Sequence, residues 1–262
     1  MTNIRLHIAY DGTKYVGWQR QIAAHGKTVQ GELEKALSHA LKEDITLFGA
    51  GRTDTGVHAR EQIANFHTAC SIPPKHIPQA LLKNLPNDIV IWQAEEVPKD
   101  FHARFSPHIK TYVYSFMVNK PVLPCNRRYN YFLRKEPDWQ IVKKAALLFE
   151  GRHDFKAFAA HSTAVKNYER EITSCKLLEY KPSAELLPWQ ETGHTYVLEV
   201  SGRGFLYKMV RLIAGSLLWA GMGKINIANI EEALLEPVKI IAPALPAHGL
   251  CLKSIVYEVD KQ

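Results

Sequence analysis

The chain has 262 residues, of which 46% are hydrophobic, and its 33 Lys and Arg exceed its 26 Asp and Glu, giving a net charge of +7. This length and composition predict one or two globular domains and exclude a disordered or low-complexity chain. No apolar run approaches the ~18 residues that span a bilayer, and Met1–Tyr10 lacks the apolar stretch of a signal peptide, so we expect a cytoplasmic protein outside the membrane. The four cysteines stand singly and the twelve histidines are scattered, so no metal site is expected.

The positive charge is concentrated in the middle of the chain. Six of the seven surplus charges fall within residues 120–170, which hold eleven basic and five acidic side chains. The basic ones are Lys120, Arg127, Arg128, Arg134, Lys135, Lys143, Lys144, Arg152, Lys156, Lys166 and Arg170. Cations interleaved with aromatic residues suit phosphate contacts and base stacking, whereas a solvated, Lys-rich loop beside a helix would show the same composition. Both interpretations stay open on this feature alone.

The first part of the chain alternates strand and helix patterns. Ile4–Tyr10 alternates apolar and polar residues, which predicts a half-buried strand that ends at the Asp11-Gly12 turn. Val29–Leu41 has the helical period, with Thr28 as its N-cap. Further strands are expected at Ile45–Phe48, Gln62–His67, Ile89–Trp92 and Tyr112–Val118, the last with one aromatic face.

The second part repeats this mixture. Helices are expected at Asp138–Phe149, Phe205–Trp219 and Ile230–Leu235, and strands at Ile172–Leu178, Tyr196–Val200 and Leu250–Tyr257. Short turns separate many of the strands, which favours an α+β fold with mixed or antiparallel sheets over a doubly wound parallel one. We expect two halves, residues 1–110 and 111–262, with Pro121–Pro137 as the best candidate for a linker.

The most unusual stretch is Gly49–His58, which carries Arg52 and Asp54 between glycines. A P-loop is strongly disfavoured because Val57-His58 stands where Lys-Ser/Thr is required. A dinucleotide fingerprint is disfavoured because Asp54 stands where its third Gly belongs and no long helix follows. The remaining interpretations are a structural turn and a turn that presents its Arg and Asp to a ligand.

A distant partner for such a carboxylate is available. Arg211 lies within a predicted helix, Phe205–Trp219, that is apolar almost all round. An Arg in that setting either pairs with an acid or extends its side chain to the surface.

These residues resemble the TruA family of tRNA pseudouridine synthases. The string Gly51-Arg-Thr-Asp-Thr-Gly-Val-His-Ala59 is similar to the family's signature, and Tyr10–Gln19 resembles its opening strand and turn. Further similarities follow in chain order at Asp100–Ser106, Lys110–Tyr112, Gly151–Phe155, Met209–Leu217, Ala242-Pro243 and Gly249-Leu250. The resemblance therefore covers nearly the whole chain. Thr55, Lys208 and His248 depart from the family's usual residues, which puts only fine substrate contacts in doubt.

The resemblance implies an isomerase without cofactor or metal that converts uridine to pseudouridine at positions 38, 39 and 40 of the tRNA anticodon stem-loop. By carry-over, Asp54 is the catalytic nucleophile, Arg211 pairs with it, Arg52 helps hold the flipped nucleotide and Tyr112 stacks on the target base. It also implies a homodimer and an active-site cleft between two similar halves. For Tyr112 alone, core packing would be the default interpretation.

Two other functions remain to be separated from this one. A non-catalytic RNA-binding protein would explain the basic stretch, and a nucleotide-binding oxidoreductase would explain Gly49-x-Gly51.

Overall fold

The computed structural model describes residues 1–21, 26–118, 124, 126–160, 165–180, 194–236 and 241–261. The chain forms two compact units, of which the first comprises Met1–His108 together with Leu252–Gln262 and the second Ile109–Cys251. The sequence-based division placed residues 252–262 in the second half, whereas the structure groups them with the first. The reason is strand β10 (Leu250–Tyr257), which begins in the second unit and continues in the first.

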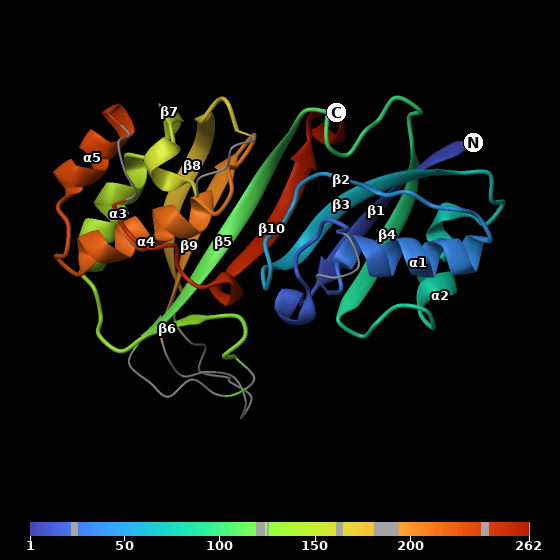
Figure 1. The fold of residues 1–262 in the computed structure, drawn as a ribbon, viewed down its shortest axis with the longest axis horizontal. Helices are drawn as coiled ribbons and strands as arrows, with labels where there is room; N and C mark the ends of the chain where they lie inside the picture. Colours follow the sequence, from blue (N-terminus) through green and yellow to red (C-terminus); the bar gives the residue numbers. More distant parts are fainter. Residues whose placement is uncertain are drawn as a thin grey trace. The chain divides into compact units, whose positions relative to one another are not determined.

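The sheet of the first unit has β1 (Thr2–Tyr10) between β4 (Ile89–Val97) and β3 (His58–Thr68), all antiparallel (Figure 1). The short strand β2 (Phe48–Gly49) pairs with β3. On β1, Ile4, Leu6 and Ile8 alternate with more polar neighbours and are buried, as the period-2 pattern predicts. The strand expected at Ile45–Phe48 is wrong except for its last residue, because Ile45 and Leu47 are buried without pairing as a strand.

The α-helices α1 (Val29–Leu41) and α2 (Ile77–Leu81) accompany this sheet, and Figure 1 shows α1 running across the strands of its unit. The predicted cap is confirmed, since the Gly31 N–H donates to Thr28 Oγ1 at 3.2 Å. Leu33 and Leu37 lie on the inner face of α1 and are fully buried. The helix ends at Lys42, which adopts a left-handed conformation with φ 59°.

The second unit repeats the plan. Its strands are β5 (His108–Val118), β9 (Thr195–Gly202), β8 (Glu169–Tyr180) and β7 (Gly151–Asp154), which pair antiparallel in that order. Strand β6 (Tyr131–Leu133) pairs with β5 in parallel, so the sheet is mixed. Strand β6 lies inside the expected linker, whose residues 121–123 and 125 are outside the described part. The α+β class with two similar halves is confirmed.

The α-helices in the described part of this unit are α3 (Trp139–Leu147), α4 (Met209–Gly221) and α5 (Ile227–Leu235). Asp138 caps α3 by accepting hydrogen bonds from the N–H groups of Gln140 and Ile141. The helix expected from Phe205 begins four residues later, because Lys208 has φ 58° and cannot continue a right-handed helix.

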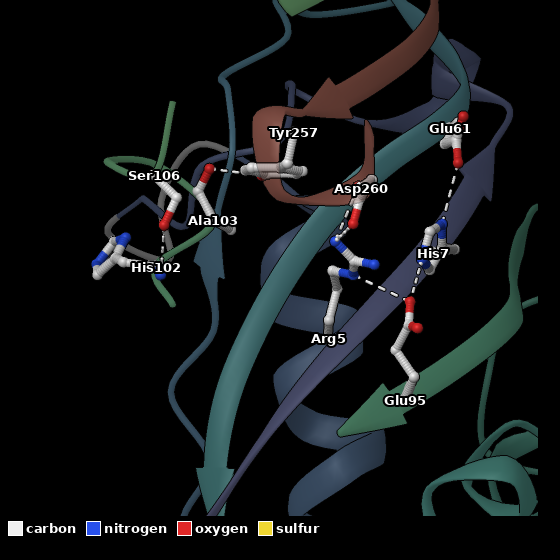
Figure 2. A network of polar contacts seen from close by, with 9 residues as sticks. All are labelled: Arg5, His7, Glu61, Glu95, His102, Ala103, Ser106, Tyr257 and Asp260. Atoms are coloured by element: carbon white, nitrogen blue, oxygen red, sulfur yellow. Dashed lines mark hydrogen bonds and ion pairs between the residues drawn. The ribbon is translucent and has the colours of Figure 1, made fainter. Parts of the chain in front are cut away.

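Within the first unit, a network of polar side chains connects the last residues of the chain to β1 and β4. Arg5 on β1 donates to Glu95 on β4 at 3.0 Å and to Asp260 at 2.8 Å (Figure 2). His7 bridges the carboxylates of Glu95 and Glu61 at 2.8 and 3.0 Å. Burial alone would lower the pKa of Arg5, but its hydrogen bonds to Asp260 and Glu95 raise the pKa overall.

Candidate active site

Asp54 lies in the loop between β2 and β3. Its carbonyl accepts a hydrogen bond from the Val57 N–H at 3.1 Å, which closes a tight turn over residues 54–57. Gly56 is the third residue of this turn and has φ +76°, a conformation that disfavours a side chain. The Asp54 side chain is half-buried and Arg52 is exposed. Gly56 therefore allows the chain to form this turn, and the turn holds the Asp54 carboxylate at a partly accessible position.

The segment 11–18 fixes this loop through its backbone. The Trp18 N–H donates to the Thr53 carbonyl at 3.1 Å, and the Gly56 N–H donates to the Tyr15 carbonyl at 3.2 Å. The approach is so close that a Cβ on Gly17 would lie 2.6 Å from the Thr53 oxygen. Two of the strings that carried the family resemblance, Tyr10–Gln19 and Gly51–Ala59, thus form one structural assembly around Asp54.

Hydrogen bonds that involve side chains also hold this loop in place. The Tyr10 and Thr53 hydroxyl groups are hydrogen-bonded at 2.8 Å, and both residues are buried. The Gly12 N–H donates to His58 Nδ1 at 3.1 Å, at the far end of the loop. Tyr10 and Thr53 were not expected as site residues, because a tyrosine at the end of a strand has the same pattern as a core residue. For Thr53 the signal was its position next to Asp54, and for Tyr10 it was its place in the Tyr10–Gln19 string.

Arg52 contacts a different neighbour. Its Nε donates to Gln19 Oε1 at 3.1 Å, and the Gln19 amide in turn donates to Gln30 on α1 at 2.8 Å. Arg52 is therefore linked to the N-terminal end of α1 through a chain of polar side chains.

Arg211 lies in the first turn of α4. Its Nε donates to the Leu245 carbonyl at 2.6 Å, and the Leu245 N–H donates to the Arg211 carbonyl at 3.1 Å. One turn further along α4, a Cβ on Gly215 would lie 2.0 Å from the Pro243 oxygen. The segment around Pro243 therefore packs directly on α4 and orients the Arg211 side chain.

Tyr114 supports this segment from the sheet. Its hydroxyl donates to the Pro246 carbonyl at 2.8 Å, and Gly249 leaves room for its ring. Burial raises the pKa of Tyr114, against a smaller lowering by the nearby Arg211 cation. Tyr114 is thus neutral and serves as a hydrogen-bond donor that holds the backbone next to Leu245.

Tyr112 lies two residues earlier on β5 and opposite Val200 on β9. It is 7% exposed, and its ring meets that of Phe205 edge-on, with centroids 5.1 Å apart. The sequence-predicted residues are therefore divided: Arg52 and Asp54 belong to the first unit, and Tyr112 and Arg211 to the second. The pairing of Asp54 with Arg211 stays a prediction.

The basic stretch of residues 120–170 belongs to the second unit. Most of its described basic side chains are exposed, including Arg127, Arg128, Arg134 and Lys135, whereas Lys120 lies outside the described residues. Arg170 is an exception, because it donates to the carbonyls of Asn167 and Glu169, and burial lowers its pKa.

The described part of the chain offers no other kind of site among those considered from the sequence. There, no three His, Cys, Asp or Glu side chains are grouped as metal ligands, and no helix is long and apolar enough to cross a membrane. Cys70 and Cys175 are free thiols, and Cys125 lies outside the described residues. Strand β3 follows the glycines of residues 49–56, so the helix that a P-loop or dinucleotide fingerprint requires is not there.

Comparison with known proteins decides between the remaining interpretations. A family model described as tRNA pseudouridine synthase matches residues 7–106 and 145–258, which include Arg52, Asp54 and Arg211 but not Tyr112. The chain belongs to the tRNA pseudouridine synthase family. Its members are isomerases, and this chain is therefore an isomerase.

Curated relatives cover the same length. A tRNA pseudouridine synthase A 2 of Clostridium perfringens is 40% identical over 98% of this chain and all of its own length. Enzymes named tRNA pseudouridine synthase A from Ruminiclostridium cellulolyticum and Moorella thermoacetica are 41% and 38% identical, with the same coverage. The family assignment therefore applies to both units.

Proposed function

We propose that this protein isomerises uridine to pseudouridine in tRNA, with Asp54 as the nucleophile. The observation that supports this most strongly is the rigid presentation of Asp54 on a turn held by backbone contacts from residues 15–18, in a chain of this family. The proposed sites are positions 38, 39 and 40 of the anticodon stem-loop. The proposal includes a homodimer in the cytoplasm.

The proposed reaction needs no net oxidation and no added group. The glycosidic bond between N1 and C1′ breaks, the detached uracil turns, and a new bond forms between C5 and C1′. The C5 proton is lost and N1 gains one, so atoms and charge balance. A carboxylate promotes this by attacking either the anomeric carbon or the uracil ring, and the target nucleotide must first leave its stack to reach it.

Arg211 is proposed as the counter-charge that keeps Asp54 ionised. Arginine suits this role because it stays charged and can bind a carboxylate through two nitrogens. Its Nε is engaged by Leu245, so the pairing would use the terminal nitrogens of the guanidinium group. Tyr112 is proposed to stack on the target base and Arg52 to hold the flipped nucleotide. The exposed basic side chains of the second unit are proposed to contact the RNA backbone.

The test is pseudouridine mapping on unmodified tRNA transcripts that carry uridine at 38, 39 or 40. Asp54→Ala should abolish product while leaving the affinity for tRNA nearly unchanged, because the carboxylate acts on the reacting nucleotide. Asp44→Ala changes an exposed carboxylate of the same unit and should retain wild-type activity. Product at the wild-type rate from Asp54→Ala would refute the role of Asp54. Tight binding of tRNA by the wild-type protein, with no product from any transcript, would instead support a non-catalytic RNA-binding protein.

A further inference from the structure

Three aromatic rings of the first unit form an exposed cluster, which we call the aromatic platform: Phe48, His102 and Phe105. The His102 ring lies between the other two, with centroids 4.9 Å from Phe48 and 4.4 Å from Phe105. Phe105 is 71% exposed and Phe48 is 38% exposed, so burial in the chain's own core does not account for them. The Arg104 guanidinium lies 5.5 Å from the centroid of the Phe105 ring.

His102 and Phe105 of the platform lie in a loop that is anchored by buried polar side chains, whereas Phe48 belongs to β2. Asn3 donates to the Phe101 carbonyl at 2.8 Å, and the Ala103 N–H donates to Asn65 Oδ1 at 2.9 Å. The Tyr257 hydroxyl donates to the Ala103 carbonyl at 2.6 Å (Figure 2). Asn3, Asn65 and Tyr257 are all 1% exposed or less. The backbone on either side of His102 is therefore held by the sheet and the C-terminal segment.

Hydrogen bonds within the loop orient the rings. The Arg104 N–H donates to His102 Nδ1 at 3.1 Å, and the Phe105 N–H donates to the His102 carbonyl at 3.0 Å. The His102 N–H donates to Ser106 Oγ at 3.0 Å (Figure 2). Burial and the nearby Arg104 lower the pKa of His102, so its ring is neutral at pH 7. The platform is thus preorganised, and a ligand would meet little ordering cost there.

The chemistry of the platform matches one class of ligand best. Flat, exposed rings beside an arginine bind nucleobases, because every base has a stacking face and the cation attracts the phosphate. The platform also lies near the proposed nucleophile along the chain. Phe48 is six residues before Asp54, so even a fully extended chain would place their Cα atoms within about 20 Å.

We propose that the aromatic platform stacks an unpaired base of the tRNA substrate other than the target uridine, with Arg104 on the adjoining phosphate. This inference rests on the proposed function for the identity of the RNA. It assigns the residues 102–105 to substrate binding, at a distance from the reacting atoms.

The experiment compares Phe105→Trp, Phe105→Leu and Phe105→Ala for tRNA binding and single-turnover pseudouridine formation. Leu and Ala should each raise Kd about tenfold, because they lack a stacking face, whereas Trp should stay within about twofold of wild type. The rate of the bound complex should change little in all three. Leu82→Ala is the matched control, since Leu82 belongs to the same unit and is 72% exposed, and it should bind as wild type.

Salt titration separates stacking from charge. Phe105→Ala should leave the slope of log K against log salt unchanged, whereas Arg104→Ala should reduce it by about one. Unchanged affinity in Phe105→Ala would overturn the proposal, as would retained affinity in Phe105→Leu, which would indicate a merely apolar contact.

Sedimentation of the variants without RNA tests whether Phe105 instead mediates self-association of the protein. Loss of self-association in Phe105→Leu and Phe105→Ala without loss of RNA affinity would show a contact between copies of this chain and would overturn the proposal. Wild-type protein that forms no pseudouridine, yet whose tRNA binding still depends on the aromatic ring at position 105, would refute the proposed function while supporting the platform.

Discussion

Arg211, which we propose to act in catalysis, is held in place by a single neighbouring residue. The Leu245 carbonyl accepts a hydrogen bond from Arg211 Nε, and the Leu245 N–H donates to the Arg211 carbonyl. One residue therefore holds both the side chain and the backbone of Arg211. Tyr114 fixes the next residue, Pro246, from the sheet. The orientation of the guanidinium group is therefore set before any substrate binds, which is what preorganised electrostatic stabilisation requires.

We expect Arg211→Ala to lower single-turnover kcat by about a hundredfold with a much smaller change in Kd for tRNA, because the side chain is proposed to act on Asp54 and not on phosphates. Arg211→Lys should restore part of the rate, since lysine keeps the charge but not the two-nitrogen geometry. For contrast, Arg134→Ala removes an exposed cation of the basic stretch and should weaken binding while sparing the rate. Equal losses of rate and affinity in Arg211→Ala would contradict this role.

The sequence was most informative about single residues where a local rule was broken. Asp54 and Arg52 were recognisable because glycines surround them, and Arg211 because a charge in an apolar helix needs an explanation. Tyr10, Thr53 and Tyr114 were not recognisable as supports, since their roles depend on hydroxyl partners that lie 43 and 132 positions away along the chain. Patterns of period 2 and 3.6 contain no information about such contacts.

At the scale of elements, α4 and the segment at Pro243 depend on close backbone approach. A side chain on Gly215 would overlap the Pro243 oxygen, so the distance between helix and segment is possible only with glycine. The sequence predicted α4 from its apolar composition but began it too early, because the left-handed turn at Lys208 depends on its surroundings. The strand expected at Ile45–Phe48 overlaps the two-residue β2 only at Phe48 for a similar reason, since its pairing to β3 decides its conformation.

Gly215→Ala should therefore lower the free energy of unfolding by about 1–3 kcal/mol or more, because the segment must move away from the helix. It should also lower kcat, since the same movement displaces Leu245 from Arg211. Urea unfolding and single-turnover rates measure the two effects. Gly204→Ala is the control, because its Cβ would meet its nearest atom at an ordinary 3.7 Å. If Gly215→Ala were as stable as wild type, the segment around Pro243 could move away from α4 without an energetic cost.

At the scale of the whole molecule, the first unit is built from both ends of the chain. Arg5 and Asp260 are hydrogen-bonded although 255 positions separate them. Glu95 completes this network from β4, and while burial alone would raise its pKa, hydrogen bonds with His7 and Arg5 lower it below the ordinary 4.5.

Folding therefore favours the ionised form of Glu95. Its contribution to stability should be complete above about pH 5 and should disappear as the pH falls through the lowered pKa of the folded state. Urea unfolding between pH 6 and pH 3.5 measures this decline. Glu95→Gln should be less stable at pH 6 and should lose less stability on acidification. Glu96→Gln, at the exposed neighbouring position, should behave as wild type. If the free energy of unfolding of Glu95→Gln fell as steeply with pH as that of wild type, the pH dependence would come from other groups.

The joining of Leu252–Gln262 to the first unit has a consequence for synthesis. Tyr257 and Asp260 reach the N-terminal strand and the loop at Ala103 only after the ribosome has made the entire intervening unit. A nascent chain paused anywhere before residue 252 carries an unfinished first unit, in which the Arg5 guanidinium lacks Asp260 and the Ala103 carbonyl lacks the Tyr257 hydroxyl. Premature termination would thus damage the half that was translated first.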